Sequence, residues 1–185
     1  VQQSVPKDNV NITIDDTTAS VAEAVALKCT NSVVGINTTR SISSFFGSTE
    51  QQAGGGSGVI YSADGYIITN YHVIADAVGS SRSKIDVFIG DSNSTPYGAS
   101  VVGYNISCDL AVLKIDASGL TPIELGNSND LRVGQQVVTI GSPSGIEFMG
   151  SVTAGIISGL DRTVSTSPDL KLIQTDAAIN PGNSG

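Results

Sequence analysis

The chain has 185 residues, of which 39% are hydrophobic and 14% charged, a composition too apolar and too weakly charged for a disordered protein. Its formal net charge of −8, without any run of Lys or Arg, argues against binding to nucleic acid or to an anionic lipid surface. The length suits one domain or two small units that share a core, and 21 glycines favour short strands and tight turns over a helical bundle.

The chain is expected to begin with a flexible polar segment, residues 1–19, because this segment lacks hydrophobic periodicity. Ser20, followed three residues later by Glu23, has the pattern of a capping box and predicts a short helix to about Lys28. The stretch "NSVVGINTT" then predicts a strand, and the Ser-, Gly- and Gln-rich residues 41–56 predict a loop.

The rest of the chain predicts strands that are separated by turns. Asp64-Gly65 lies between two β-rich runs and indicates a hairpin. Further strands are expected at 83–90, 97–105, 108–116, 135–141, 150–160 and 170–176. Together they predict an all-β fold, a barrel or a sandwich, with one early helix. A break near 117–122 divides residues 20–119, with the helix and a first β unit, from residues 120–185, a second β unit.

Three residues suggest chemistry only when they are taken together. Singly, His72 fits a surface or core histidine, Asp109 a solvated strand end, and Ser184 an ordinary turn. A serine hydroxyl needs a base to remove its proton, histidine titrates near neutrality, and a carboxylate can orient the imidazole. The chain order His72, Asp109, Ser184 is that of chymotrypsin-type proteases, so the three residues predict a catalytic triad.

The glycines around the serine have a physical use of their own. Gly182 and Gly185 can adopt backbone angles that are closed to other residues. We therefore predict that the backbone N–H groups of Gly182, Asn183 and Ser184 point at one spot. Such a spot is an oxyanion hole, which stabilises the negative charge of a tetrahedral intermediate.

Metal and nucleotide chemistry are not expected. One histidine and two well-separated cysteines, Cys29 and Cys108, cannot supply a usual zinc site, and no Gly-rich phosphate loop opens a helix. We accordingly expect no cofactor. The two cysteines form either one disulfide or two small buried apolar residues, and the sequence leaves both alternatives open.

Four stretches resemble the HtrA (Deg) family of serine proteases, namely "GSGVIYSADGYIITNYHVI", "DLAVLKI", "GSVTAGIISG" and "QTDAAINPGNSG". The resemblance covers roughly residues 20–185. It implies a chymotrypsin-like fold of two perpendicular β-barrels with the active site in the cleft between them. It also implies that His72 is the general base, that Asp109 orients it, and that Ser184 is the nucleophile.

The same resemblance implies a biological setting. Proteases of this family degrade unfolded or misfolded proteins without ATP, in protein quality control and stress response, and some act as chaperones. We expect a location in the cell envelope, periplasmic or extracellular, with a membrane anchor upstream of Val1 as one alternative. A homo-trimer or larger assembly and a PDZ domain after the protease are further expectations. Because Asn183 cannot form the ion pair of trypsin-like zymogens, activation by N-terminal cleavage is not expected.

The chain also departs from the family pattern. The family follows the serine with another glycine and a closing pair of strands, so the second barrel is expected to be incomplete, through truncation, clipping or a disordered remainder. We expect weak or no peptidase activity from these 185 residues alone, and activity from a longer form. The alternative function is a non-cleaving, chaperone-like binding module that keeps the fold.

Overall fold

The computed structural model describes residues 20–44, 47–143, 145–164 and 167–185, so the expected flexible segment 1–19 lies outside the described residues. The helices and strands are α1 (Val21–Cys29), β1 (Val33–Ser44), β2 (Gly47–Ile60), β3 (Tyr66–Thr69), α2 (Tyr71–Ile74), β4 (Ser83–Phe88), β5 (Tyr97–Asn105), β6 (Leu110–Ile115), β7 (Gln136–Gly141), β8 (Ser151–Val164) and β9 (Ser167–Thr175). Within the described ranges, no helix is long and apolar enough to cross a membrane.

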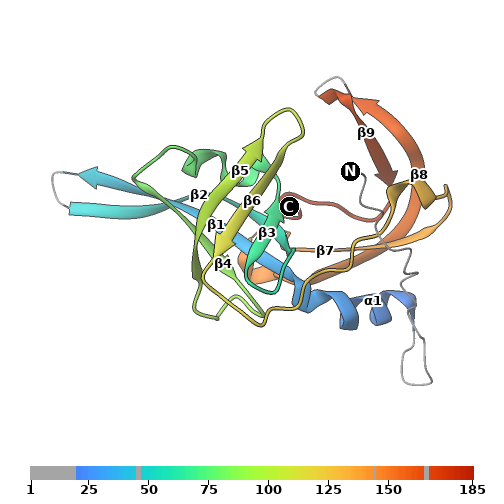
Figure 1. Ribbon diagram of the computed structural model, residues 1–185, viewed down its shortest axis with the longest axis horizontal. Helices are drawn as coiled ribbons and strands as arrows, with labels where there is room; N and C mark the ends of the chain where they lie inside the picture. Colours follow the sequence, from blue (N-terminus) through green and yellow to red (C-terminus); the bar gives the residue numbers. More distant parts are fainter. Residues whose placement is uncertain (1–19, 45–46, 144, 165–166) are drawn as a thin grey trace, which may run out of the picture.

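The first six strands form a closed barrel in the order β1-β2-β3-β6-β5-β4 (Figure 1). Its wall is antiparallel throughout, and the side chains of β6 alternate between the solvent and the core. The fully buried interior consists mainly of β-branched and leucine side chains, which suit the pleated wall: Val34, Ile36, Ile60, Ile67, Ile74, Val87, Leu113 and Ile115. This closed barrel carries the strands that lead to His72 and Asp109.

The remaining strands form a separate three-stranded antiparallel sheet, β7-β8-β9, beside the barrel (Figure 1). Helix α1 lies against β7 and β8, and the chain after β9 returns to the barrel, so that its C-terminal end lies beside β3. Several apolar side chains of this sheet remain exposed, among them Val152, Ile156 and Ile173. The predicted all-β fold, with a short N-terminal helix and an open second unit, is confirmed.

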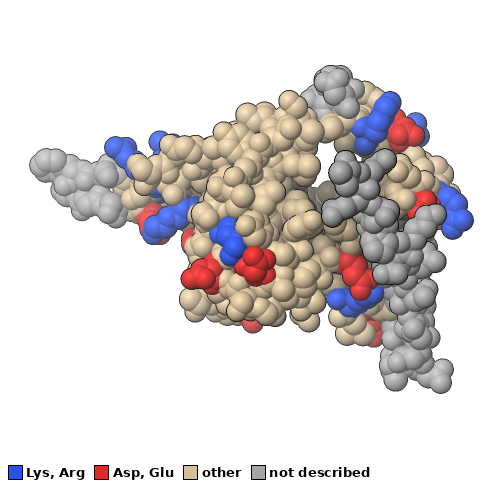
Figure 2. All heavy atoms as spheres, viewed as in Figure 1, with Lys and Arg blue, Asp and Glu red and all other residues tan. Residues whose placement is uncertain are grey.

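The predicted start of α1 is also confirmed. The Ser20 hydroxyl accepts a hydrogen bond from Glu23 N–H at 3.2 Å, and the helix ends at Cys29, one residue beyond the expected end. Cys29 and Cys108 are both free and half-buried, so the structure excludes the disulfide alternative. Figure 2 shows acidic and basic side chains interspersed on the visible face, with no continuous basic patch.

The loop predicted at 41–56 is wrong for the described residues of that range. They belong to β1 and β2, which pair in register from Thr39 with Gln52 to Ser44 with Gly47. Figure 1 shows this pair as a ribbon that projects beyond the barrel. A projecting ribbon has no core to face, so its strands need no alternation of apolar and polar residues. Their polar sequence therefore has the composition of a loop, which is why a loop was predicted. Residues 45–46 lie outside the described residues.

Candidate active site

The pairing of β3 with β6 brings His72, which follows β3, close to Asp109, which precedes β6. Thr69, the last residue of β3, pairs with Ala111 near the start of β6. His72 follows β3 in the one-turn helix α2. The next two residues, Val73 and Ile74, are buried in the barrel and therefore fix the position of α2.

Asp109 occupies a left-handed backbone conformation, with φ of 51°, in the turn before β6. Such a conformation is uncommon for a residue other than glycine, so neighbouring groups must hold it. Its carbonyl oxygen accepts two hydrogen bonds, from Asn70 Nδ2 at 2.8 Å and from Tyr71 N–H at 3.1 Å. Its own N–H donates to the Ile106 carbonyl at 3.1 Å, which closes the turn.

The Asp109 carboxylate holds His72 by two contacts. Its Oδ2 lies 2.7 Å from His72 Nδ1, and its Oδ1 accepts a hydrogen bond from the His72 backbone N–H at 2.9 Å. The His72 side chain is 56% exposed and the Asp109 side chain 39% exposed. Among the described residues, His72 Nε2 makes no hydrogen bond, so this nitrogen can exchange a proton with a substrate or with a hydroxyl.

Ser184 reaches the same region from the far end of the chain. Its carbonyl oxygen accepts a hydrogen bond from Ser57 N–H on β2 at 2.6 Å. A Cβ placed on Gly56 would lie 2.5 Å from this oxygen and 2.7 Å from Cγ2 of Val73, the residue after His72. The serine backbone and α2 therefore approach the same glycine. No hydrogen bond joins Ser184 to His72 in the part of the chain that the structure describes.

The three predicted oxyanion donors of the serine loop differ in their hydrogen bonds. Asn183 N–H donates to the Asn180 carbonyl at 3.0 Å, within the loop. Within the described ranges, the N–H groups of Gly182 and Ser184 donate no hydrogen bond. Gly182 has φ of 98°, a conformation that glycine adopts without strain.

Sequence reasoning missed the supporting residues Asn70, Ser57 and Ser142. The Ser57 hydroxyl donates to the Gly182 carbonyl at 3.0 Å and accepts from Ser142 N–H at 2.9 Å. The position of Asn70, two residues before His72, was a usable signal. The run "GGGSG" around Ser57 was not, because its glycines are equally typical of a loop.

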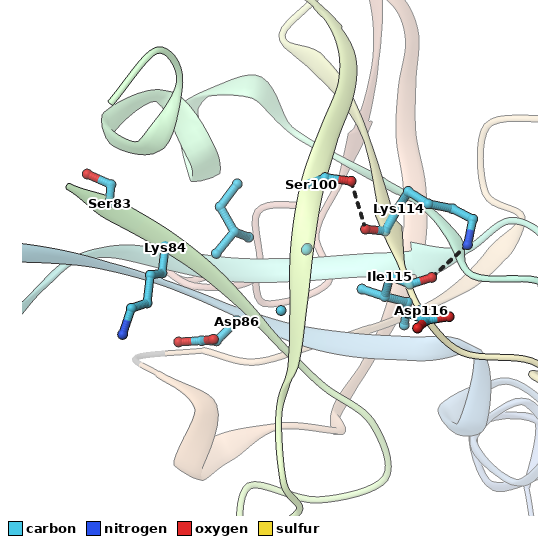
Figure 3. Close-up of a pocket in the computed structure, with 10 residues that line it drawn as sticks. Ser83, Lys84, Asp86, Ser100, Lys114, Ile115 and Asp116 are labelled. Atoms are coloured by element: carbon cyan, nitrogen blue, oxygen red, sulfur yellow. Dashed lines mark hydrogen bonds between the residues drawn. The ribbon is translucent and has the colours of Figure 1, made fainter. Parts of the chain in front are cut away.

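The hollow drawn in Figure 3 does not compete with this site. It lies in the barrel wall where β4 and β5 diverge, and both of its lysines already have partners. Lys84 pairs with Glu50, while Lys114 Nζ donates to the carbonyls of Asp64 and Ile115 at 2.6 and 2.7 Å. The described residues also contain no group of three or more His, Cys, Asp or Glu side chains that could hold a metal ion.

The known family with the description "Trypsin-like peptidase domain" matches residues 56–185, a range that includes His72, Asp109 and Ser184. The chain belongs to this family. A serine protease, PepD of Mycobacterium tuberculosis, is 47% identical over 175 residues, which are 88% of this chain and 35% of that protein. The Do-like serine protease HtrA of Bacillus subtilis is 43% identical over 170 residues, which are 83% of this chain and 36% of that protein.

Solved structures agree with these relatives. Deg5 is 37% identical, with a TM-score of 0.68 over 87% of this chain and 75% of that chain. The HtrA-type protease AlgW in complex with a decapeptide is 34% identical, with a TM-score of 0.72 over 88% of this chain and 53% of that chain. The resemblance to HtrA proteases is thus confirmed, and with it the chymotrypsin-like fold. The chain spans about a third of the length of the curated relatives it matches.

Proposed function

We propose that this trypsin-like peptidase chain is the catalytic part of an HtrA-type serine endopeptidase. The observation that carries the proposal is the double contact of the Asp109 carboxylate with His72, which orients the imidazole and leaves Nε2 free. In this assignment His72 is the general base, Asp109 holds and stabilises the imidazolium, and Ser184 is the nucleophile. The approach of Ser184 and of the residue after His72 to the same glycine supports it.

The reaction follows from these roles. Ser184 Oγ attacks the scissile carbonyl carbon while His72 Nε2 takes its proton, and the imidazolium then gives this proton to the leaving amine. Water, activated by the same histidine, hydrolyses the acyl-enzyme. The N–H groups of Gly182 and Ser184 stabilise the oxyanion, and Asn183 is the spacer between them, because its own N–H is occupied by Asn180.

The substrates we propose are unfolded or misfolded polypeptides, cleaved in a compartment of the cell envelope or outside the cell. A peptide-bound HtrA-type relative supports a polypeptide substrate, and a relative from Halomonas elongata that is described as periplasmic supports the compartment. A homo-trimer or larger assembly and a PDZ domain in the parent protein complete the proposal. Light scattering of the purified parent protein tests the assembly, and a monomer would contradict it.

Labelling of the longest natural form of the chain with a fluorophosphonate probe tests the catalytic assignment. We expect the probe to attach to Ser184, with labelling abolished in Ser184→Ala and nearly abolished in His72→Ala. The double variant should label no less than the single variant with the lower labelling, because the two residues act as a unit. Ser100→Ala, at an exposed position on β5, is the matched control and should label normally. A folded protein whose Ser184 does not react would instead favour the non-cleaving binding module.

A further inference from the structure

Ser57 is a buried serine in the wall of the barrel, on strand β2. It is 1% exposed and stands in a glycine run, with Gly54, Gly55 and Gly56 before it and Gly58 after it. Two of these glycines have no room for a larger residue, since a Cβ on Gly56 or Gly58 would lie within 3.0 Å of its neighbours. Ser57 therefore supplies the only side chain of residues 54–58, and this side chain ends in a hydroxyl.

The polar groups of Ser57 connect three parts of the chain. Its hydroxyl donates to the Gly182 carbonyl at 3.0 Å and accepts from Ser142 N–H, in the loop after β7, at 2.9 Å. Its backbone N–H donates to the Ser184 carbonyl at 2.6 Å, and its carbonyl accepts from Thr69 Oγ1 at 2.7 Å. The Ser57 hydroxyl thus lies between the loop after β7 and the serine loop, and bonds to both.

The bond to Gly182 fixes one particular peptide plane. In a trans peptide the carbonyl oxygen and the following N–H point in opposite directions, and this chain has no cis peptide among its described residues. The plane between Gly182 and Asn183 is held at its oxygen by Ser57 Oγ and at its N–H by the Asn180 carbonyl. The N–H groups on either side of this plane are those of Gly182 and Ser184, the two proposed oxyanion donors.

We propose that Ser57 is a positioning residue whose hydroxyl sets the orientation of the oxyanion donors and ties it to the loop that contains Ser142. This inference rests on the proposed function, and it adds a residue to which no chemical role was assigned. When the hydroxyl is removed, the peptide plane between Gly182 and Asn183 keeps its bond to Asn180 but loses its bond to the barrel. The plane is then free to turn, and the flanking donors no longer converge on the oxyanion.

The test compares Ser57→Ala with Ser32→Ala. Ser32 lies directly before β1 and is also buried, with 2% of it exposed. In the longest natural form of the chain, we expect Ser57→Ala to lower kcat and the rate of fluorophosphonate labelling about 10- to 100-fold, with KM changed much less, because the lost interaction acts in the transition state. Ser32→Ala should leave both rates unchanged. A thermal melt of each variant separates an effect on the site from a loss of folded protein.

Two further measurements keep the inference open to refutation. Ser57→Cys fills the same space with a weakly hydrogen-bonding thiol, so it should show the same loss of kcat even where the alanine variant does not fold. Amide hydrogen exchange of Asn183 should become faster in Ser57→Ala and not in Ser32→Ala. Folded Ser57 variants with wild-type kcat and unchanged exchange would overturn the inference. A wild-type protein that does not label at all would overturn the proposed function, and the exchange result would then decide the positioning role alone.

Discussion

Replacing Gly56 by alanine should slow catalysis while the barrel stays folded. The added Cβ would lie 2.5 Å from the Ser184 carbonyl oxygen and 2.7 Å from Cγ2 of Val73, whereas ordinary contact begins at 3.4 Å. The buried Val73 side chain must also give way, because both of its γ carbons lie within 3.1 Å of the added Cβ. The Ser184 oxygen belongs to the backbone, so the serine loop must retreat by about 0.9 Å and weaken its 2.6 Å hydrogen bond to Ser57.

The size of the effect follows from this displacement. A misplacement of about 1 Å at a reacting group costs on the order of 100-fold in rate. That factor corresponds to about 2.7 kcal/mol of activation free energy. We therefore expect kcat for peptide hydrolysis in Gly56→Ala to fall about 100-fold, with a parallel fall in the rate of fluorophosphonate labelling at Ser184.

A second glycine of the barrel wall supplies the control. Gly98 on β5 has no heavy atom within 4 Å of the position of an added Cβ, so Gly98→Ala should leave kcat and the thermal midpoint nearly unchanged. A folded Gly56→Ala protein with the wild-type kcat would refute the reasoning. So would an equal loss in Gly98→Ala, because that result would make the effect a general one of alanine in the barrel.

Leu113→Ala, at a fully buried position, should lower the free energy of unfolding by about 2–5 kcal/mol in a urea titration, and an unchanged midpoint would contradict the assigned core. Asp109→Asn should lower kcat by a factor on the order of 10⁴, because the amide no longer stabilises the His72 imidazolium; a loss below about tenfold would count against the triad. Thr38→Val should be neutral or stabilising in a thermal melt, because the Thr38 hydroxyl is buried without a hydrogen-bond partner, and clear destabilisation would reveal a missed partner. Burial raises the pKa of the Cys29 thiol, so the folded protein at pH 8 should react with iodoacetamide more slowly than the urea-unfolded chain, and an equal rate would show that the thiol is exposed.

The barrel could be predicted from the sequence because its strands face a core. The run at 97–105 gives the bounds of β5 as the structure has them, and the apolar run at 108–116 contains β6. The start of α1 was equally readable, because the Ser20 cap is a local interaction. Hydrophobic patterns and helix caps involve residues that are close in the chain, so they can be recognised in the sequence without knowledge of tertiary contacts.

The details of the site could not be predicted in the same way. The left-handed φ of Asp109 depends on hydrogen bonds from Asn70 and Tyr71, and the register of β3 with β6 brings those residues near. The occupied N–H of Asn183 depends on the turn that the loop adopts against β2. Both features arise from tertiary contacts, whereas the proposal of His72, Asp109 and Ser184 rests on a chemistry that limits the choice of residue types.

The serine loop binds to a strand that was synthesised much earlier. Ser57 and Gly182 are 125 positions apart in the chain, yet their hydrogen bond helps to fix the loop. As a chain leaves the ribosome, its N-terminal part folds first, so the barrel with His72 and Asp109 can form before Gly182 has been added. The newly made protein would therefore hold a folded but inert barrel while residues 116–182 are added, and peptide-bond cleavage would begin only after the serine loop has been made and has docked.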